Sequence, residues 1–452
     1  MNKFSLKEII KVTGADTNTN DEIIFQGITT DSRKISPGVL FVALKGETFD
    51  GENFAGDAIK KGAAGVLVGK NFSAEIPGAI LKVADTLEAY QKIGGYWRDR
   101  FDIPVVAVTG SSGKTTTKDL TAAVLTALGK IQKTSANFNN EIGVPLTLLG
   151  INDEHKAAVV EIGMRGLGQI EALAKFVKPT IAIITNVNET HIELLGSMEN
   201  IAKAKGELAE AIKPGGTVIL NADNSYTEDI KKVVAPGVNI LTFAVENPAD
   251  IKAENISAHQ TSTDFDLLYR GKKYHMDLPV IGRHNVLNAL SAVAVGISCG
   301  ISFDEMQRGF STLVTTKMRF EVIRRDNLVI VNDAYNASPA SMCASIKTVS
   351  EIYDGRKIAV LGDMLELGNI AEKSHREVGK EVFENNFDVL ITYGELGKFI
   401  AAGAKDAGME KVFTTDTREE TAKKILAVIK DGDTILFKAS HGMHLEKVIE
   451  MI

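Results

Sequence analysis

Short apolar runs alternate with amphipathic stretches along most of the chain. Runs rich in Val and Ile and bounded by turn residues predict buried strands. They lie at 103–109, 157–162, 180–187, 217–221, 329–332, 357–361, 389–393 and 434–438. Helical patterns lie at 86–100, 114–128, 198–212, 285–300 and 445–452. Strands that alternate with helices predict βαβ units and mainly parallel sheets, so we expect an α/β fold.

Two regions depart from this alternation. The stretch to about Asp85 has short β-like runs, such as 39–44 and 65–68, between Gly-containing turns. The stretch 233–279 is polar and strand-like, which favours an antiparallel addition to the central domain. At roughly 150 residues per domain, a chain of 452 residues predicts three domains. We expect a small α/β domain at 1–85, a central parallel-sheet domain at 86–312 and a Rossmann-like domain at 313–452.

Composition narrows the class of protein. The hydrophobic fraction of 44% and the charged fraction of 24% are ordinary for a soluble globular protein. The net charge of −7 gives no basic field for nucleic acid or an anionic membrane. We see no signal peptide in MNKFSLKEIIKVTG and no apolar run of about 18 residues. Two distant cysteines, Cys299 and Cys343, fit a reducing compartment, so we expect a cytoplasmic protein.

A phosphate-binding loop is predicted where the strand 103–109 meets the helix that begins at Lys114. Small residues let backbone N–H groups approach phosphates, and the helix N-terminus adds a favourable dipole. Lys114 can neutralise phosphate, and the Thr115 hydroxyl can bind Mg²⁺. The first glycine of the usual pattern would fall on Val108, so a simple Gly/Ser turn is the alternative. The loop comprises Gly110, Ser111, Ser112, Gly113, Lys114, Thr115 and Thr116.

Polar residues at the ends of two further strands suggest a metal or nucleotide site. Glu161 ends an apolar run, and strand C-termini are where ligands bind in open α/β sheets. Asn186, Asn188 and His191 follow the next strand, where an imidazole could bind a metal. The alternatives are a turn carboxylate and an ordinary hydrogen-bonded histidine.

Two further segments have plainer interpretations from chemistry alone. The segment AKAKGE, with Lys203 and Lys205, is typical of a solvated lysine face on a helix. Asn137, Asn139 and Asn140 form an amide-rich loop, which is either a polar turn or a site that orients an anion.

Taken together, these segments resemble the Mur ligases, in the order of that family and over essentially the whole chain. The loops GSSGKTT and NFNNEIGVP are most similar to the family member that adds D-alanyl-D-alanine. The Asp-Asn-Pro-Arg motif of the diaminopimelate-adding relative has no match, which argues against a free diamino acid as the amine. The other matching segments are ITTDSRKISPGVLFVALKGETFDG, TNVNETH, AKAKGE, GRHN, KMRFE, DAYNASP, VLGDMLELG and FKASHGMHLE.

The resemblance implies three domains that bind a UDP-muramoyl-peptide, Mg-ATP and the incoming amine. It implies that Lys205 is carbamylated and that it binds the second of two Mg²⁺ ions with Glu161 and His191. Asn285 would contact adenine, Arg319 the ATP phosphates and Asp333 the ribose. The residues that would hold the UDP-sugar are Ser32, Arg33, Lys45 and Gly46. The residues expected near the dipeptide are Asn336, Ala337, Ser338 and Pro339.

The expected reaction joins D-alanyl-D-alanine to UDP-N-acetylmuramoyl-tripeptide through an acyl phosphate, and we expect a monomer. Lys114, Arg319 and the two Mg²⁺ ions would supply positive charge for it. Another Mur ligase or a folylpolyglutamate-type ligase stays open within the class. A P-loop kinase, a nucleotide switch or a catalytically silent binding module are the alternatives from other classes.

Overall fold

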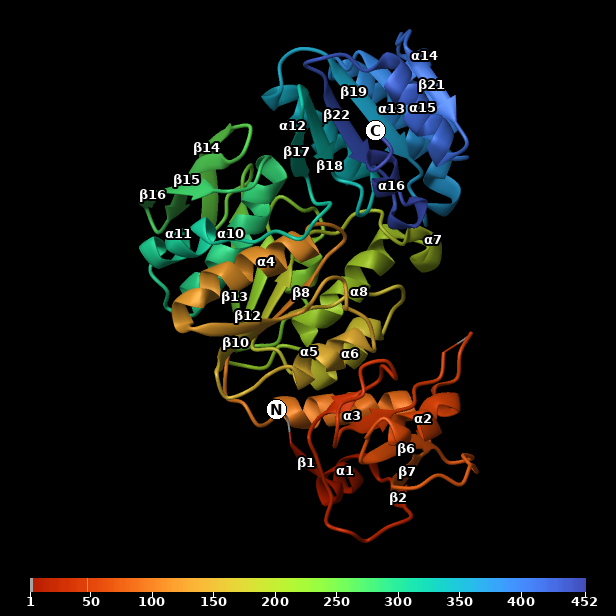
Figure 1. The fold of residues 1–452 in the computed structure, drawn as a ribbon. Coiled ribbons are helices and arrows are strands. Elements are labelled where there is room, and N and C mark those ends of the chain that lie inside the picture. The colour runs from red at the N-terminus through yellow and green to blue at the C-terminus, as the bar shows by residue number, and fades with distance from the viewer. Residues whose placement is uncertain (1–2, 47) are drawn as a thin grey trace. The chain divides into compact units, whose positions relative to one another are not determined.

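The computed structural model describes residues 3–46 and 48–452 and has a mixed α/β fold with parallel sheets, which confirms the predicted fold class (Figure 1). The chain divides into two compact units. The first comprises Met1–Ala107, Leu128–Gly163 and Glu171–Thr180, and the second comprises Val108–Ala127, Met164–Ile170 and Ile181–Ile452. Among the described residues, no helix is long and apolar enough to cross a membrane.

The first unit begins with a five-stranded sheet whose strand order is β2-β7-β6-β5-β4. Four strands are parallel and β2 is antiparallel at one edge. Alternate residues of β5 enter two different cores, Leu40 and Val42 on one face and Phe41 on the other, as the two-residue period of a strand requires. The elements are β1 (Phe4–Ser5), α1 (Leu6–Thr13), β2 (Asp16–Thr17), β3 (Ile24–Phe25), β4 (Ile28–Thr29), β5 (Leu40–Val42), η1 (Gly51–Phe54), α2 (Ala55–Lys60), β6 (Gly65–Gly69) and β7 (Ala79–Val83).

The rest of the first unit holds the parallel pair β9 (Lys130–Lys133) and β10 (His155–Glu161). Helix α3 (Thr86–Arg98) begins where the Asp85 side chain accepts hydrogen bonds from the N–H groups of Leu87 and Glu88, at 2.8 and 3.0 Å. Such capping satisfies donors that the first helical turn leaves open. Helices α5 (Gly143–Leu149) and α6 (Gln169–Val177) follow. Strand β8 (Val105–Thr109) starts in the first unit and ends in the second.

In the second unit, the strands β11 to β16 lie side by side in chain order. Strands β11 to β14 are parallel, and only β14, β15 and β16 pair antiparallel. The predicted antiparallel addition at 233–279 is therefore wrong for β13, which extends the parallel sheet. Its apolar run Leu241–Ala244 lies beside the buried β12, so burial decides the pairing. The strands are β11 (Ile181–Ile184), β12 (Thr217–Asn221), β13 (Asn239–Ala244), β14 (Ile251–Ala258), β15 (Thr263–Tyr269) and β16 (Lys272–Leu278).

The helices that accompany these strands include α4, which carries the predicted phosphate loop at its start and packs against α10 and α11 (Figure 1). Residues 126–128, predicted as the end of this helix, form the short η2 instead. The helices are α4 (Lys114–Leu125), α7 (Ile192–Leu195), α8 (Met198–Glu210), α9 (Thr227–Lys231), α10 (Arg283–Ser298) and α11 (Phe303–Ser311).

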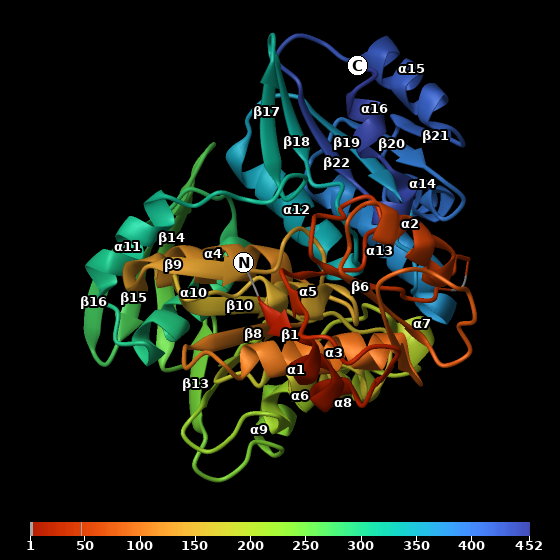
Figure 2. The same cartoon turned by 60° about the horizontal axis from the view of Figure 1, so that its bottom comes forward.

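The last part of the second unit is a six-stranded sheet with the order β17-β18-β22-β19-β20-β21, parallel except for β17. Helices cover both faces of it (Figure 2). The final helix is shorter than the predicted 445–452. The elements are β17 (Glu321–Arg325), β18 (Leu328–Asn332), α12 (Pro339–Ile352), β19 (Lys357–Gly362), η3 (Gly368–Ile370), α13 (Ala371–Glu384), β20 (Val389–Tyr393), α14 (Gly397–Asp406), β21 (Val412–Thr415), α15 (Arg418–Val428), β22 (Thr434–Lys438), η4 (His441–Met443) and α16 (Glu446–Ile449).

Candidate functional site

The predicted phosphate loop connects β8 to α4 and needs glycine at two positions. Gly110 has φ +148° and Gly113 has φ +77°, conformations that L side chains rarely adopt. A Cβ on Gly110 would lie 1.9 Å from Thr185 Oγ1, and one on Gly113 would lie 2.4 Å from Asn288 Oδ1. Both glycines therefore allow close packing as well as the turn that opens α4.

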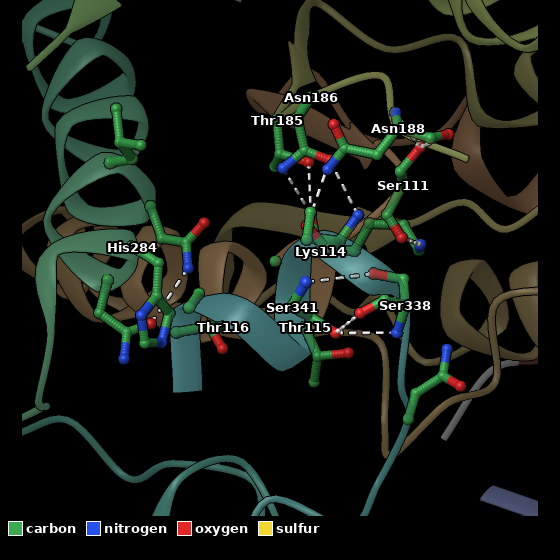
Figure 3. A pocket seen from close by; sticks show the side chains of 18 of the residues that line it. Ser111, Lys114, Thr115, Thr116, Thr185, Asn186, Asn188, His284, Ser338 and Ser341 are labelled. Atoms are coloured by element: carbon green, nitrogen blue, oxygen red, sulfur yellow. Dashed lines mark hydrogen bonds between the residues drawn. The ribbon is translucent and has the colours of Figure 1, made fainter. Parts of the chain in front are cut away.

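The asparagines after β11 hold the loop in shape (Figure 3). Ser111 N donates to Asn186 O at 3.0 Å, and Ser112 N donates to Asn186 Oδ1 at 2.9 Å. Asn188 N donates to Ser111 Oγ at 2.8 Å, and Thr185 Oγ1 donates to Ser112 O at 2.6 Å. We predicted Asn186 and Asn188 at this strand end from the sequence. In the structure, both residues support the loop through hydrogen bonds.

Lys114 and Thr115 begin α4 and face the same space. Lys114 Nζ lies over its own loop and donates to Gly110 O at 2.7 Å and Ser111 O at 3.3 Å. The Thr115 hydroxyl is buried and accepts a hydrogen bond from Arg319 Nη2 at 3.1 Å. Three predicted residues that are up to 205 positions apart in the sequence, from Lys114 to Arg319, are thus brought together.

A cavity of about 360 Å³ lies over the loop. Its walls come from the loop, the ends of β11, β12 and β13, the start of α10, and the segments around Arg319 and Asp333. Most of the predicted nucleotide residues line it: Ser111, Ser112, Gly113, Lys114, Thr115, Thr116, Asn285, Arg319 and Asp333. Asn221, Asp223 and Asn224, at the end of β12, also line it and were missed, although their position after an apolar strand was the available signal.

Three hydrogen bonds hold the carboxylate of Asp333 in place. Its carboxylate accepts hydrogen bonds from Phe320 N at 3.1 Å, Ser345 Oγ at 2.6 Å and Lys438 Nζ at 2.5 Å. Burial lowers the pKa of Lys438, while the neighbouring Asp333 carboxylate raises it and partly offsets that change. We did not predict a role for Lys438 from the sequence. This residue lies in FKASHGMHLE and joins the ends of β22 and β18.

Three residues at the start of α10 form one wall. Asn285 Nδ2 donates to Ile281 O at 2.8 Å, and its Oδ1 accepts from Asn288 Nδ2 at 3.1 Å. Asn288, another residue that sequence reasoning missed, also accepts from the Thr117 hydroxyl of α4 at 3.2 Å. Burial lowers the pKa of His284 to about 4, so its ring is neutral near pH 7.

The segment expected near the dipeptide begins beside the cavity. Asn336, Ala337 and Ser338 line it. Ser338 caps α12, accepting from Ser341 N at 3.4 Å, and Pro339 is the first residue of that helix. Pro is favoured there because this position needs no N–H donor. The structure therefore presents this segment as a rigid helix entry at the cavity wall.

His191 lies at the start of α7 with φ +64° and bonds through Nδ1 to the Glu366 carboxylate. Glu366 comes from VLGDMLELG and also forms an ion pair with Arg165 at 3.6 Å. Burial lowers the pKa of His191, while the Glu366 carboxylate raises it. Glu366 was missed, since nothing local in the sequence pairs it with His191.

The two lysines of AKAKGE have opposite environments on α8. Lys203 is exposed, as a solvated lysine face predicts, but Lys205 is only 1% exposed. Burial, helped by the nearby positive charge of Lys114, lowers the pKa of Lys205 well below its ordinary value. The solvated interpretation is therefore wrong for Lys205. A buried amine of this kind without a carboxylate partner is unusual, because burying an unpaired charge is costly.

Glu161 belongs to the first unit, where it is the last residue of β10 and 2% exposed. Its Oε1 accepts a hydrogen bond from Asn139 Nδ2 at 2.8 Å, and its N–H donates to Thr134 Oγ1 at 3.0 Å. The amide-rich loop therefore orients this carboxylate, which supports the second of the two interpretations of Asn139.

The four residues predicted to hold a UDP-sugar lie on the surface of the first unit. Arg33 is paired with Asp31, and these hydrogen bonds lower the pKa of Asp31 to about 2. Ser32 O accepts from Lys61 Nζ at 2.9 Å, and Lys45 lies 3.3 Å from Asp50. Gly46 N donates to Phe49 O at 2.9 Å. Arg33 and Lys45 are thus exposed cations beside small turns.

No group of three or more His, Cys, Asp or Glu side chains that could hold a metal ion occurs in the described ranges. Single donors that fit Mg²⁺ are the Thr115 hydroxyl and the Glu161 carboxylate, and the Lys205 amine would fit only if it is converted into an oxygen ligand. The buried, uncompensated Lys205 is the observation that makes such a conversion physically reasonable.

Comparison with known proteins agrees with this geometry. Three family models match: the Mur ligase family, catalytic domain at residues 24–93, the Mur ligase middle domain at 108–296, and the Mur ligase, glutamate ligase domain at 318–441. The chain belongs to the Mur ligase family, which confirms the predicted family.

Individual relatives share nearly the full length. The UDP-N-acetylmuramoyl-tripeptide--D-alanyl-D-alanine ligase of Bacillus subtilis (strain 168) is 37% identical, covering 99% of this chain and 97% of its own. The crystal structure of MurF from Acinetobacter baumannii has a TM-score of 0.92 at 31% identity and covers 100% of this chain and 98% of its own. The MurF ligase from Thermotoga maritima in complex with ADP has a TM-score of 0.83 at 28% identity, covering 94% and 96%.

Proposed function

We propose that this chain is an ATP-dependent ligase that joins D-alanyl-D-alanine to UDP-N-acetylmuramoyl-tripeptide, giving the pentapeptide used in peptidoglycan synthesis. The observation that carries the proposal is the cavity on which Lys114, Thr115 and Arg319 converge. Two cations around a loop of this geometry suit a triphosphate. The names of the full-length relatives support the choice of substrates.

The first step transfers a phosphoryl group. The terminal carboxylate of the tripeptide attacks the γ-phosphorus of ATP, the bond to the β,γ-bridging oxygen breaks, and an acyl phosphate and ADP result. Two anions must approach each other, so positive charge and alignment are the catalytic needs. Lys114 and Arg319 both line the cavity and would supply this charge.

The second step forms the amide bond. The amine of D-alanyl-D-alanine attacks the acyl carbon, a tetrahedral intermediate forms, and phosphate leaves as the amine loses a proton. We assign Asn336, Ala337, Ser338 and Pro339 to the region that receives the dipeptide. Their position at a capped helix entry on the cavity wall supports this assignment.

We further propose that the site uses two Mg²⁺ ions, with Thr115 at one and Glu161, His191 and a carbamate on Lys205 at the other. Bound Mg²⁺ would supply charge at the phosphates. The lowered pKa of Lys205 supports the carbamate, because only an uncharged amine adds to CO₂. The adduct would place oxygen ligands where the chain alone has an amine.

Lys203 provides the matched control for the proposed carbamate on Lys205. The mass of the intact protein, prepared without acid, should be about 44 Da above the chain mass, and Lys205→Ala should abolish the increment while exposed Lys203→Ala keeps it. The Lys205→Ala protein should also lose Mg²⁺-dependent nucleotide binding. An unmodified Lys205 in a fully active preparation would overturn the carbamate.

The substrates are tested by phosphate release from Mg-ATP. Release should require both UDP-N-acetylmuramoyl-tripeptide and D-alanyl-D-alanine, and mass spectrometry should identify the pentapeptide. Release with a single amino acid instead would indicate another Mur ligase or a folylpolyglutamate-type enzyme. Phosphorylation of a hydroxyl acceptor without free phosphate would indicate a kinase, and only slow turnover with a nucleotide-dependent partner would indicate a switch.

The remaining assignments complete the proposal. Residues 1–85, with Ser32, Arg33, Lys45 and Gly46, would bind the UDP-sugar, 86–312 would bind ATP, and 313–452 would bring Arg319 and the dipeptide region. Asn285 would contact adenine and Asp333 the ribose. We place the enzyme in the cytoplasm and expect a monomer, which sedimentation velocity would test.

A further inference from the structure

The backbone around Arg319 is bent in a way that most residues avoid. Met318 has φ +60° and Phe320 has φ +53°, so two non-glycine residues in the left-handed region flank the arginine. Each such residue carries a conformational cost, because the left-handed region brings Cβ close to the following carbonyl oxygen. A turn of this kind persists only where surrounding contacts determine it.

Hydrogen bonds between this turn and one neighbouring segment provide those contacts. Tyr335 N donates to Met318 O at 3.3 Å, and Phe320 N donates to Asp333 Oδ1 at 3.1 Å. The turn is thus fastened on both sides of Arg319 by DAYNASP. Lys438 and Ser345 in turn hold the Asp333 carboxylate.

The side chain of Arg319 needs a separate support. Its guanidinium carbon lies 3.8 Å from the centre of the Tyr335 ring, a close cation–π contact. The Tyr335 ring also stacks with His441, with ring centres 5.2 Å apart and an angle of 29° between the planes. The arginine therefore rests on a ring that is itself packed against a second ring.

This support matters because Arg319 has few other partners. Its Nη2 donates to Thr115, while its Nε is buried and has no hydrogen-bond partner among the described residues. An arginine side chain loses much rotamer freedom when it is fixed in one conformation. Without the ring, one hydrogen bond would be left to hold it toward the phosphate loop.

We propose that Tyr335 is a positioning residue that holds the Arg319 guanidinium toward the terminal phosphate of ATP. The inference deepens the proposed function and rests on its assignment of Arg319 to the ATP phosphates. Tyr335 is half-buried and contacts Arg319 through its ring, and among the described residues that line the cavity Arg319 is present and Tyr335 is not. Its effect on nucleotide binding therefore passes through the arginine.

The test compares a triphosphate with a diphosphate. Binding of a non-hydrolysable ATP analogue and of ADP is measured by calorimetry for Tyr335→Leu and Tyr335→Phe. Tyr335→Leu should weaken the analogue about tenfold and ADP less than about twofold, since only the analogue carries the terminal phosphate. Tyr335→Phe keeps the ring and should retain affinity within about twofold.

Tyr269→Leu is the matched control. Arg270 lies over the Tyr269 ring at 5.1 Å, a second cation–π pair on β15 that has no place in the proposed site. Its loss should leave both affinities unchanged. Thermal unfolding of all three variants separates a general loss of stability from the expected ligand-specific effect.

A double-mutant comparison makes the inference sharper. In an Arg319→Ala background, Tyr335→Leu should cause no further loss of affinity for the analogue, because its target is gone. A further tenfold loss there, or equal weakening of ADP and the analogue, would overturn the positioning role and leave the proposed function standing. If the unchanged protein binds no ATP analogue, the proposed function fails first and the inference with it.

Discussion

The phosphate loop and the turn that carries Arg319 face one cavity, but they are built in different ways. The loop takes its shape from glycines, a helix start and the asparagines of one neighbouring strand end. The arginine turn has no glycine on either side of Arg319 and is strained at Met318 and Phe320. It depends on Asp333, Tyr335 and Lys438, which lie 14 to 119 positions further along the chain.

This difference shows where each half of the site is vulnerable. The loop has glycines at its unusual backbone positions and is held largely through backbone groups, so side-chain changes in it remove chemistry and leave the fold. The turn is strained and depends on side chains from other segments, so changes outside the turn can displace its arginine. Four measurements test this contrast.

The largest effect is expected from the loop itself. Lys114→Ala removes a cation beside the proposed phosphates and should lower kcat by about 10³-fold, with a much smaller effect on unfolding because Lys114 is partly exposed and donates to carbonyls of its own loop. Phosphate release and thermal unfolding measure the two effects. Exposed Lys130→Ala is the control, and a similar loss there would contradict the assignment.

Arg319 tests the other half. Arg319→Ala should lower kcat about 10²-fold, because the charge that reaches Thr115 from the C-terminal part of the unit is lost. Arg319→Lys should recover little, since an ammonium lacks the planar fork of a guanidinium. Near-normal turnover of Arg319→Ala in the phosphate-release assay would refute its role at the ATP phosphates.

His284 stands in the wall between the two regions and makes stability depend on pH. Its folded pKa of about 4 lies below the ordinary value of 6.5. The unfolded chain therefore takes up a proton before the folded one as the pH falls from 6.5 to 4. Stability should fall by about 2 kcal/mol between pH 7 and pH 5 on this account.

Denaturant unfolding at several pH values checks the His284 effect. His284→Gln has no such titration, so its stability should depend less steeply on pH over that window. An equal slope in the two proteins would show that another group causes the loss. The two proteins are compared by the slope of stability against pH, and not by absolute stability, because the substitution also changes packing near Phe320.

The smallest effect is expected where the turn begins. Thr316 donates a hydrogen bond to Asp119 of α4 at 2.8 Å, and Thr316→Val should cost about 1 kcal/mol of stability. If the turn is as dependent on distant contacts as proposed, KM for ATP should also rise about twofold. Unchanged KM with reduced stability would show that this contact contributes to the stability of the fold and not to ATP binding.

Local features of the site could be predicted from sequence. The loop 110–116, Glu161 at a strand end and the main strands follow from periodicity and turn residues. The burial of Lys205 could not be predicted, because Lys203 and Lys205 look alike in sequence and only the packing of α8 distinguishes them. The pairing of Glu366 with His191 and of Lys438 with Asp333 joins segments more than 100 positions apart, which no local pattern encodes.

The two glycines of the phosphate loop have a consequence for inhibitors. Any side chain at Gly110 or Gly113 would meet Thr185 or Asn288 within hydrogen-bonding distance or closer and would need a left-handed backbone. Mutation therefore has little freedom to alter this surface. A compound that binds against the bare backbone there should meet fewer resistance mutations than one that depends on the exposed side chains of Arg33 or Lys45.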